Sequence, residues 1–288
     1  MRKMLFLCAT VSIVSIILIG LFVFVEGYPI MYKVGFFNFI FGQKWSPSEG
    51  FYGILPMIVG TFYITLGALM LGVPISIFTA IFLAEYAPKR IEKMINPAIE
   101  LLAGIPSVVY GLFGMTKVVP IVREIQKSYF GNGSSPMQSG YSVLAAAVVL
   151  SIMISPTVIS VAKDALKSVQ GELKAASLAL GATKWQTTWR IVVPMARPGI
   201  AAAIILGMGR AIGETIAVIM VAGNRVGFPE SVFSPVRSLT GNIAIEMAYA
   251  AAGDHTQALF GTGMVLFGLI MAINAFAMRL YKKGTRAK

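Results

Sequence analysis

Long hydrophobic runs, separated by short polar segments, dominate this chain of 288 residues. A helix needs about 20 consecutive apolar residues to cross the roughly 30 Å hydrocarbon core of a bilayer. Windows of this kind predict transmembrane helices within about 4–25, 52–84, 98–120, 142–162, 198–223 and 258–278. The pattern therefore predicts an all-α, polytopic membrane protein with about six transmembrane helices.

Helix-breaking residues lie inside several of these windows. The window at 52–84 is too long for one upright helix, and Gly72 and Pro74 interrupt it, so we expect a tilted, kinked or broken helix. Pro106 and Pro156 each remove a backbone donor and favour a kink. Four hydroxyl side chains near these two prolines are candidates for lining a transport pathway: Ser107, Tyr110, Ser155 and Thr157. Their alternative role is to bond a backbone carbonyl of their own helix.

The composition excludes an ordinary soluble domain. Hydrophobic residues make up 57% of the chain and charged residues only 12%, against roughly 25% charged in a soluble domain. In membrane proteins, lysine and arginine are concentrated in short cytoplasmic loops. Placing both termini in the cytoplasm puts more than twice as many basic residues inside as outside, which predicts that orientation. The same bias accounts for most of the net charge of +12 without nucleic-acid binding.

The sequence gives no sign of enzymatic or metal chemistry. The single cysteine excludes an internal disulfide, and the sequence has neither a Cys/His metal spacing nor the G-x-x-x-x-G-K-[ST] loop that binds ATP phosphates. His255, the only histidine, has no partner ligands nearby in sequence and is expected to be solvated or to pack within an outer loop. We therefore expect no catalytic residues, no metal and no cofactor bound by this chain.

The segment at 163–197, between the fourth and fifth spans, is too long and too regularly patterned for a simple connector. Apolar residues over 162–180 recur at helical spacing, which predicts an amphipathic helix. Gly181 follows where a left-handed turn can end that helix, and Thr183 and Gln186 have the spacing of a capping box that starts a second one. The pattern favours either an interfacial helix on lipid headgroups or a docking site for a cytoplasmic partner.

This segment resembles the EAA loop of ABC-transporter permeases, whose pattern is E-A-A, three residues, G, nine residues, I, one residue and L-P. The matching positions are Ala175, Ala176, Ser177, Gly181, Ile191, Val193 and Pro194. Ala175 replaces the glutamate and Val193 the leucine of the pattern, whereas the glycine turn is kept. The resemblance implies that residues 172–186, which include Thr183, dock on a separate subunit that hydrolyses ATP.

The fifth span contains two charged residues, which are costly inside a bilayer. Arg210 is expected near the middle of the membrane, and Glu214 lies four residues later on the same helical face, where it can pair with Arg210. One interpretation is a self-neutralising ion pair beside glycines that allow close helix packing. The other is a site on an anion pathway, because a guanidinium offers paired donors to an oxyanion.

The runs at 103–114, 179–203 and 209–224 resemble the PstC family of permease subunits of phosphate ABC importers. The resemblance implies a type I ABC importer permease fold and roles for Arg210 and Glu214 in phosphate passage. It also implies a PstA-like permease subunit as partner, a PstB-like ATPase dimer, a PstS-like phosphate-binding protein and the plasma (inner) membrane of a prokaryote. A homodimer, another oxyanion such as sulfate, molybdate or tungstate, and an ion channel are the alternatives. A channel, however, has no need of a docking loop for an ATPase.

These predictions give one membrane domain with three parts. Residues 1–51 form an N-terminal transmembrane anchor and outer loop, 52–282 form the permease core with the coupling loop at 163–197, and 283–288 form a basic cytoplasmic tail. None of the outer segments is large enough for a separate soluble domain. The expected function is therefore transport through the membrane, with ATP hydrolysis on a partner subunit.

Overall fold

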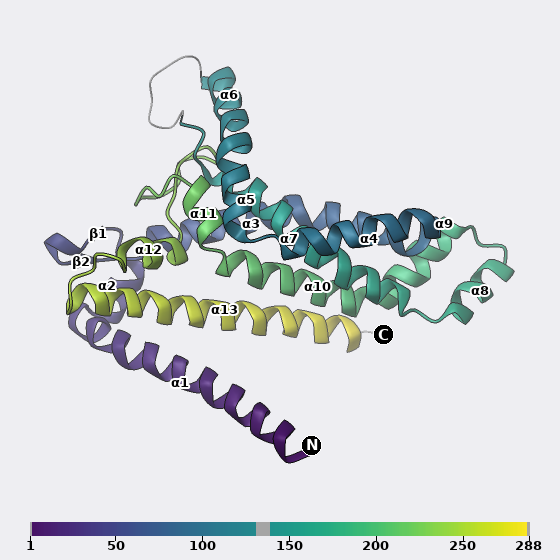
Figure 1. Cartoon of the computed structure of the whole chain (residues 1–288), viewed down its shortest axis with the longest axis horizontal. Helices are drawn as coiled ribbons and strands as arrows, with labels where there is room; N and C mark the ends of the chain where they lie inside the picture. Colours follow the sequence, from purple (N-terminus) through teal and green to yellow (C-terminus); the bar gives the residue numbers. More distant parts are fainter. Residues whose placement is uncertain (1, 131–138, 287–288) are drawn as a thin grey trace.

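The computed structural model describes residues 2–130 and 139–286, and most of its long helices lie side by side in one elongated bundle (Figure 1). Five helices among these residues are long and apolar enough to cross a membrane, and a sharply bent pair supplies a sixth span if it counts as one. The predicted all-α, polytopic architecture is thus confirmed. The last two residues of the predicted tail at 283–288 lie outside the described residues.

The helices follow one another along the chain with one short hairpin between them. The elements are α1 (Arg2–Val34), α2 (Phe36–Phe41), β1 (Trp45–Ser46), β2 (Phe51–Tyr52), α3 (Leu55–Ile81), α4 (Lys89–Gly104), α5 (Ser107–Phe113), α6 (Val119–Phe130), α7 (Val143–Lys167), α8 (Gly171–Ala179), α9 (Lys184–Thr187), α10 (Val193–Gly213), α11 (Ile216–Val221), α12 (Leu239–Glu246) and α13 (Asp254–Arg286). The two strands pair in antiparallel fashion, with Trp45 opposite Tyr52.

Helix α7 forms the centre of the bundle. It packs against α3 and α10, and 67% of its most apolar window is buried, compared with 33% or less in the other single-helix spans. Glycine lets these helices approach closely: a Cβ on Gly72 of α3 would lie 3.1 Å from the Cα of Ser151, and a Cβ on Gly199 of α10 would overlap the Cβ of Ala165. Small residues at helix crossings are a main source of helix association in membranes, because lipid tails are as apolar as the side chains.

Three π-helical turns in the described residues each end two positions before a proline. They cover Phe82–Tyr86 before Pro88, Gly114–Val118 before Pro120 and Thr188–Val192 before Pro194. A proline ring clashes with the carbonyl four residues earlier, and in each case that carbonyl lies in the π-helical turn. At Pro120 and Pro194 the wider turn moves the carbonyl away from the ring and the helix continues, whereas the helix before Pro88 ends at Tyr86.

The predicted third span at 98–120 is wrong as a single helix. α4 ends at Gly104, and a new helix starts at Ser107 after a bend of 97° (Figure 1). Pro106 explains the break, because proline disfavours the helical conformation of the preceding residue, and Ile105 has an extended ψ of 129°. The window at 52–84, by contrast, holds one continuous helix that extends to the end of its π-helical turn.

The predicted fifth span at 198–223 is also displaced. Its helix begins earlier, at Lys184, runs without a break through Pro194, and ends at Gly213. Glu214 then takes an extended conformation, with φ −71° and ψ 128°, before the chain resumes as the short helix α11. Hydropathy does not reveal this break, because the residues on both sides of it are apolar.

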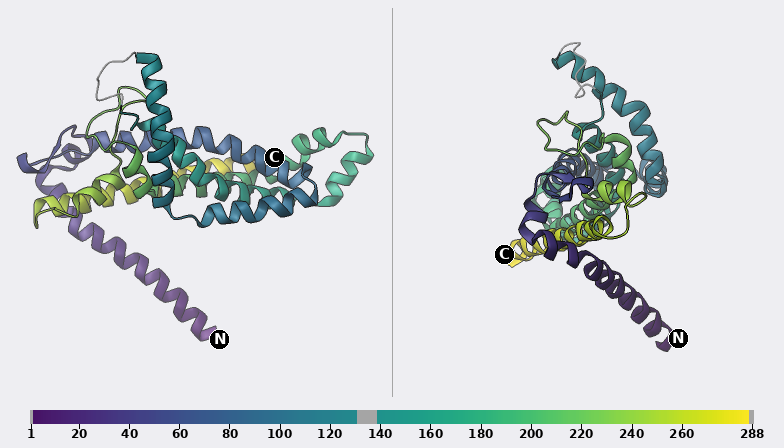
Figure 2. Two further views of the ribbon diagram at one scale, coloured as in Figure 1. Left: turned by 45° about the horizontal axis from the view of Figure 1, so that its top comes forward. Right: turned by 90° about the vertical axis from the view of Figure 1, so that its left-hand side faces the viewer.

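The two ends of the bundle carry different structures. The β1–β2 hairpin, α2 and α12 gather at one end, and α8 and α9 lie at the opposite end (Figures 1 and 2). α1 packs along α13 near the hairpin end and then diverges from the bundle (Figure 2). Side chains of α1 such as Leu5 and Phe6 are therefore exposed. The N-terminal end of α1 and the C-terminal end of α13 both point toward the side of α8 and α9 (Figure 1).

Overpacking the crossing of α7 and α10 tests the role of Gly199. Leucine at this position would overlap Ala165, so we expect Gly199→Leu to lower the free energy of unfolding by about 1–3 kcal/mol and to lower the unfolding temperature in detergent. The matched control is Ala202→Leu on the exposed face of the same helix, which should change stability by less than about 0.5 kcal/mol. Equal unfolding temperatures for the two variants would contradict the close crossing.

Candidate functional site

A glycine turn joins α8 to α9, as the sequence predicts. Gly181 has a φ of 82°, and its N–H donates to the carbonyl of Leu178 at 3.0 Å, while the N–H of Ala182 donates to the carbonyl of Ser177 at 3.2 Å. These two bonds form a Schellman motif, which satisfies the last carbonyls of a helix. Any residue with a Cβ is strained at this φ, although no atom lies within 4 Å of a Cβ built there.

The second helix of the loop begins with the predicted capping box. The N–H of Gln186 donates to Oγ1 of Thr183 at 3.2 Å, and the N–H of Thr183 donates to Oε1 of Gln186 at 2.9 Å. The predicted amphipathic helix over 162–180 is divided, however, because α7 extends to Lys167 and α8 begins only at Gly171. The loop therefore consists of a short helix, a glycine turn and a second helix that continues into α10.

Polar contacts fasten this loop to the C-terminal end of the membrane span that begins with α3. Lys174 pairs with Glu85 at 2.5 Å, and the hydroxyl of Tyr86 donates to that of Thr188 at 3.2 Å. Ser177, which is buried, bonds to another threonine hydroxyl within the loop at 2.9 Å. These bonds join α8, α9 and the π-helical turn that follows α3 into one unit, so a displacement of α8 acts directly on a membrane-spanning helix.

The predicted coupling residues fall into two groups. Four of them lie on the exposed side of the loop: Ala175, Ala176, Gly181 and Thr183. Three others face the bundle or lie within the helix that follows: Ser177, Ile191 and Pro194. Leu180 is 89% exposed and Trp185 is 61% exposed, so two large apolar side chains extend this free surface. Ala175, which stands where the loop pattern has a glutamate, therefore lies on the surface available to a partner.

Arg210 lies three residues before the end of α10 and is half-buried against α7. Nη1 of Arg210 donates to Oγ1 of Thr157 at 3.2 Å. The hydroxyl of Tyr110 lies close enough to interact electrostatically with the guanidinium. Among the described residues, no carboxylate forms an ion pair with Arg210. Because a guanidinium carries five N–H donors, most of them are left available to a ligand.

The predicted ion pair between Arg210 and Glu214 is wrong for the chain as described. The prediction assumes one continuous helix, but the helix ends at Gly213 and the geometry of residues four positions apart is lost. Oε1 of Glu214 instead accepts a hydrogen bond from the N–H of Ala217 at 3.2 Å, and its carbonyl accepts one from Oγ1 of Thr240 at 3.0 Å. Glu214 therefore connects α10, α11 and α12 at the break.

The four candidate hydroxyls have different partners. Only Thr157 contacts Arg210. Ser155 donates to a carbonyl of its own helix at 2.6 Å, which is the alternative role for such residues, whereas Tyr110 donates at 2.8 Å to the carbonyl of Leu102 in the preceding helix α4. Ser107 is half-buried at the first position of α5, directly after the right-angled break. The structure thus joins Thr157 to Arg210, places Tyr110 nearby and gives the other two hydroxyls no bond to this group.

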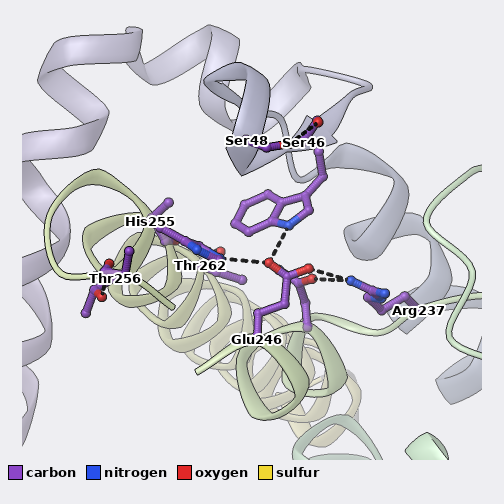
Figure 3. A network of polar contacts seen from close by, with 11 residues as sticks. Ser46, Ser48, Arg237, Glu246, His255, Thr256 and Thr262 are labelled. Carbon is purple, nitrogen blue, oxygen red and sulfur yellow. Dashed lines mark hydrogen bonds and ion pairs between the residues drawn. The ribbon is translucent and has the colours of Figure 1, made fainter. Parts of the chain in front are cut away.

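A buried charged cluster at the hairpin end escapes prediction from the sequence. Glu246, which is 6% exposed, accepts hydrogen bonds from Nε1 of Trp45 at 2.8 Å and from Nη1 of Arg237 at 2.7 Å, and it lies 2.9 Å from Nε2 of His255 (Figure 3). His255 therefore packs within the structure, but in the first turn of α13 and not in a loop as expected. These residues come from the hairpin, the segment before α12, α12 and α13, so their sequence spacing carries no signal.

Comparison with known proteins identifies the family. The chain matches the binding-protein-dependent transport system inner membrane component family over residues 72–283. A probable ABC transporter permease protein, YqgH of Bacillus subtilis, is 39% identical over 264 residues, which cover 90% of this chain and 82% of the relative. The phosphate transport system permease protein PstC of Pasteurella multocida is 38% identical over 266 residues, which cover 87% of this chain and 82% of the relative.

Solved transporters share the fold at low sequence identity. A subunit of a bacterial alginate ABC transporter, solved with an alginate-bound periplasmic protein, has a TM-score of 0.60 and 17% identity and covers 96% of this chain and 94% of its own. A subunit of the MetNI methionine ABC transporter in an inward-facing conformation has a TM-score of 0.55 and 18% identity, with coverage of 81% and 94%. The predicted type I ABC importer permease fold is thus confirmed. Because the family match includes both the core spans and the loop at 163–197, the chain belongs to the binding-protein-dependent transport system inner membrane components, as the permease subunit of an ABC importer whose ATP is hydrolysed on a separate subunit.

Proposed function

We propose that this permease subunit imports phosphate and that Arg210 binds the anion in transit. The observation that carries the proposal is the available guanidinium, which lies in a candidate membrane span, is held by the hydroxyl of Thr157 and has no carboxylate partner in the described residues. Arginine is costly within a membrane and marks a polar function there. Relatives named as phosphate transport permeases support phosphate over other oxyanions.

The chemistry of the site suits a phosphate that must also be released. A guanidinium stays protonated at physiological pH and offers paired N–H donors to two oxygens of an oxyanion. Thr157 orients the guanidinium through one donor and leaves the others for the anion. Glu214, at the end of the same helix, supplies a negative charge that opposes tight retention of the anion. A transport site needs this balance, because an ion that binds too tightly does not leave.

We further propose that the chain forms half of a translocation pathway with a PstA-like permease subunit. A PstB-like ATPase dimer would bind at α8 and α9, and a PstS-like phosphate-binding protein would dock at the hairpin end. Both termini then lie in the cytoplasm of a prokaryote, and the chain itself needs no cofactor. The two chain ends point toward the same side of the molecule as α8 and α9, which supports this orientation (Figure 1). The distribution of basic residues supports it as well.

Replacing Arg210 with glutamine tests the anion role, because glutamine keeps a hydrogen-bonding group but removes the charge. We expect uptake of labelled phosphate by vesicles that contain the whole importer to fall at least about tenfold, since hydrogen bonds to charged groups contribute about 1.5–3 kcal/mol. The matched control, Arg197→Gln on the exposed face of α10, should retain uptake. Normal uptake by the Arg210 variant at normal abundance would remove this residue from the mechanism.

The identity of the anion is tested with the unmodified importer. Phosphate should compete with labelled phosphate far better than sulfate, molybdate or tungstate does. Stronger competition by one of these other oxyanions would overturn phosphate as the substrate.

Two substitutions separate the charge of Glu214 from its hydrogen bond. Glu214→Gln keeps an oxygen that can accept from the N–H of Ala217, whereas Glu214→Ala removes both the charge and this acceptor. If the charge serves transport, we expect both variants either to lose phosphate uptake or to hydrolyse ATP without transporting phosphate. Only the alanine variant should also lose stability, by about 1 kcal/mol in the free energy of unfolding. Wild-type uptake and wild-type ATPase stimulation in the glutamine variant would limit Glu214 to a structural role.

Replacing Gly181 with valine tests docking of the ATPase at the loop. The left-handed conformation costs a residue with a Cβ about 1–2 kcal/mol, so the turn should reorganise while the protein still inserts in the membrane. We expect much less ATPase to co-purify with this variant. The matched control is Gly268→Val in α13, away from the loop, because Gly268 lies outside the left-handed region and a Cβ there has no atom within 4 Å. Equal recovery of the ATPase with both variants would contradict docking here.

A further inference from the structure

A polar stripe runs along α7 from the Arg210 contact toward the α8 end of the bundle. Thr157, Ser160, Lys163 and Lys167 recur at intervals of three or four residues, which places them on one helical face, and none of them is buried. The opposite face of the same segment consists of fully buried apolar residues: Ile154, Val158, Ala162 and Leu166. Helix α7 therefore presents a continuous polar face that starts at the proposed anion site.

The antiparallel helix α4 meets this stripe with polar residues of its own. Nζ of Lys163 donates to Oδ1 of Asn96 at 3.0 Å, and Lys167 forms an ion pair with Glu92. Glu100, one turn beyond Asn96, is exposed on α4. Ionisable side chains within membrane spans face protein or a water-filled cavity rather than lipid. The seam between α4 and α7 is thus a polar edge that leads away from Arg210.

The two lysines of the seam differ in how their charge is compensated. Lys167 is paired directly with the carboxylate of Glu92, which also accepts a hydrogen bond from Asn96 at 3.3 Å. Lys163 bonds a neutral amide oxygen and forms no ion pair within the described residues. Its charge nevertheless interacts electrostatically with the carboxylate of Glu92. Because an ammonium has three donors, Lys163 can hold Asn96 and still contact a ligand.

We propose that Lys163 is a second anion-binding residue, which receives phosphate after the anion leaves Arg210 and before it enters the cytoplasm. This inference rests on the proposed function and on the orientation with α8 in the cytoplasm. Thr157 and Lys163 are six residues apart on α7, which corresponds to about 9 Å along the helix axis. An anion can step between two such partly compensated charges, because each attracts it without trapping it. The carboxylates of Glu92 and Glu100 on the same seam keep the second site weak.

Internal phosphate provides a test, because a site on the cytoplasmic side can be occupied from inside a vesicle. In vesicles with the whole importer, internal phosphate should slow uptake. We expect Lys163→Gln to raise the internal phosphate concentration that halves uptake roughly tenfold, the factor that about 1.4 kcal/mol produces, and Lys163→Arg to restore the wild-type value. The matched control Lys93→Gln removes an exposed lysine of α4 that lies outside the polar stripe and should leave this concentration unchanged. An unchanged value for Lys163→Gln would overturn the proposal.

A reporter thiol makes the test independent of transport. In a Cys8→Ser background, Ser160→Cys places a thiol one turn from Lys163 on the same face of α7. We expect a charged thiol reagent on the cytoplasmic side to label it, and inorganic phosphate to slow labelling only while Lys163 is present. Absence of labelling, or protection that survives Lys163→Gln, would overturn the second site even in an importer that carries phosphate. Failure of the wild-type importer to carry phosphate would instead overturn the proposed function.

Discussion

The close contact of α7 with α3 and α10 is the constraint on which the rest of the structure depends. Gly72 and Gly199 let the three helices approach until backbone and Cβ atoms touch, and α7 thereby buries its apolar face. Its polar face is then fixed in direction, with Thr157 against Arg210 and with two lysines toward α4. A hydrogen bond weakens steeply with small changes in distance and angle, so a looser crossing would release the guanidinium of Arg210 from its hydroxyl partner.

Two breaks in the helices determine where polar groups can lie within the membrane region. A broken helix leaves backbone groups without partners, and in a membrane other protein groups must satisfy them. At the bend after α4, the Tyr110 hydroxyl donates to the carbonyl of Leu102 at 2.8 Å. At the end of α10, the Glu214 side chain accepts from the N–H of Ala217 at 3.2 Å. Tyr110 and Glu214, two of the candidates for the transport site, therefore each bond the backbone at a break, whereas Arg210 bonds a single hydroxyl among the described residues.

The sequence predicts well what depends on local or additive physics. Membrane spans follow from the length of apolar runs, and the turn at Gly181 and the capping box at Thr183 follow from the conformational preferences of a few adjacent residues. The pairing of Arg210 with Glu214 fails because residue spacing has meaning only within a continuous helix, and the apolar pattern continues across the break. The cluster around Glu246 is beyond sequence reasoning for another reason: its partner Trp45 is 201 positions away, and only the packed structure brings them together.

The basic side chains that lie along α7, beginning with Arg210 of α10, are increasingly neutralised by neighbouring groups in the direction that an imported anion would take. Arg210 has no carboxylate partner in the described residues, Lys163 bonds a neutral amide, and Lys167 pairs directly with Glu92. This order lowers the cost of leaving each site, but binding sites alone do not set a direction, because they act equally on anions that arrive from either side. The direction must come from ATP hydrolysis on the separate subunit. The structural link is the pairing of Lys174 in α8 with Glu85 after α3, because α3 also supports α7 and with it the polar stripe.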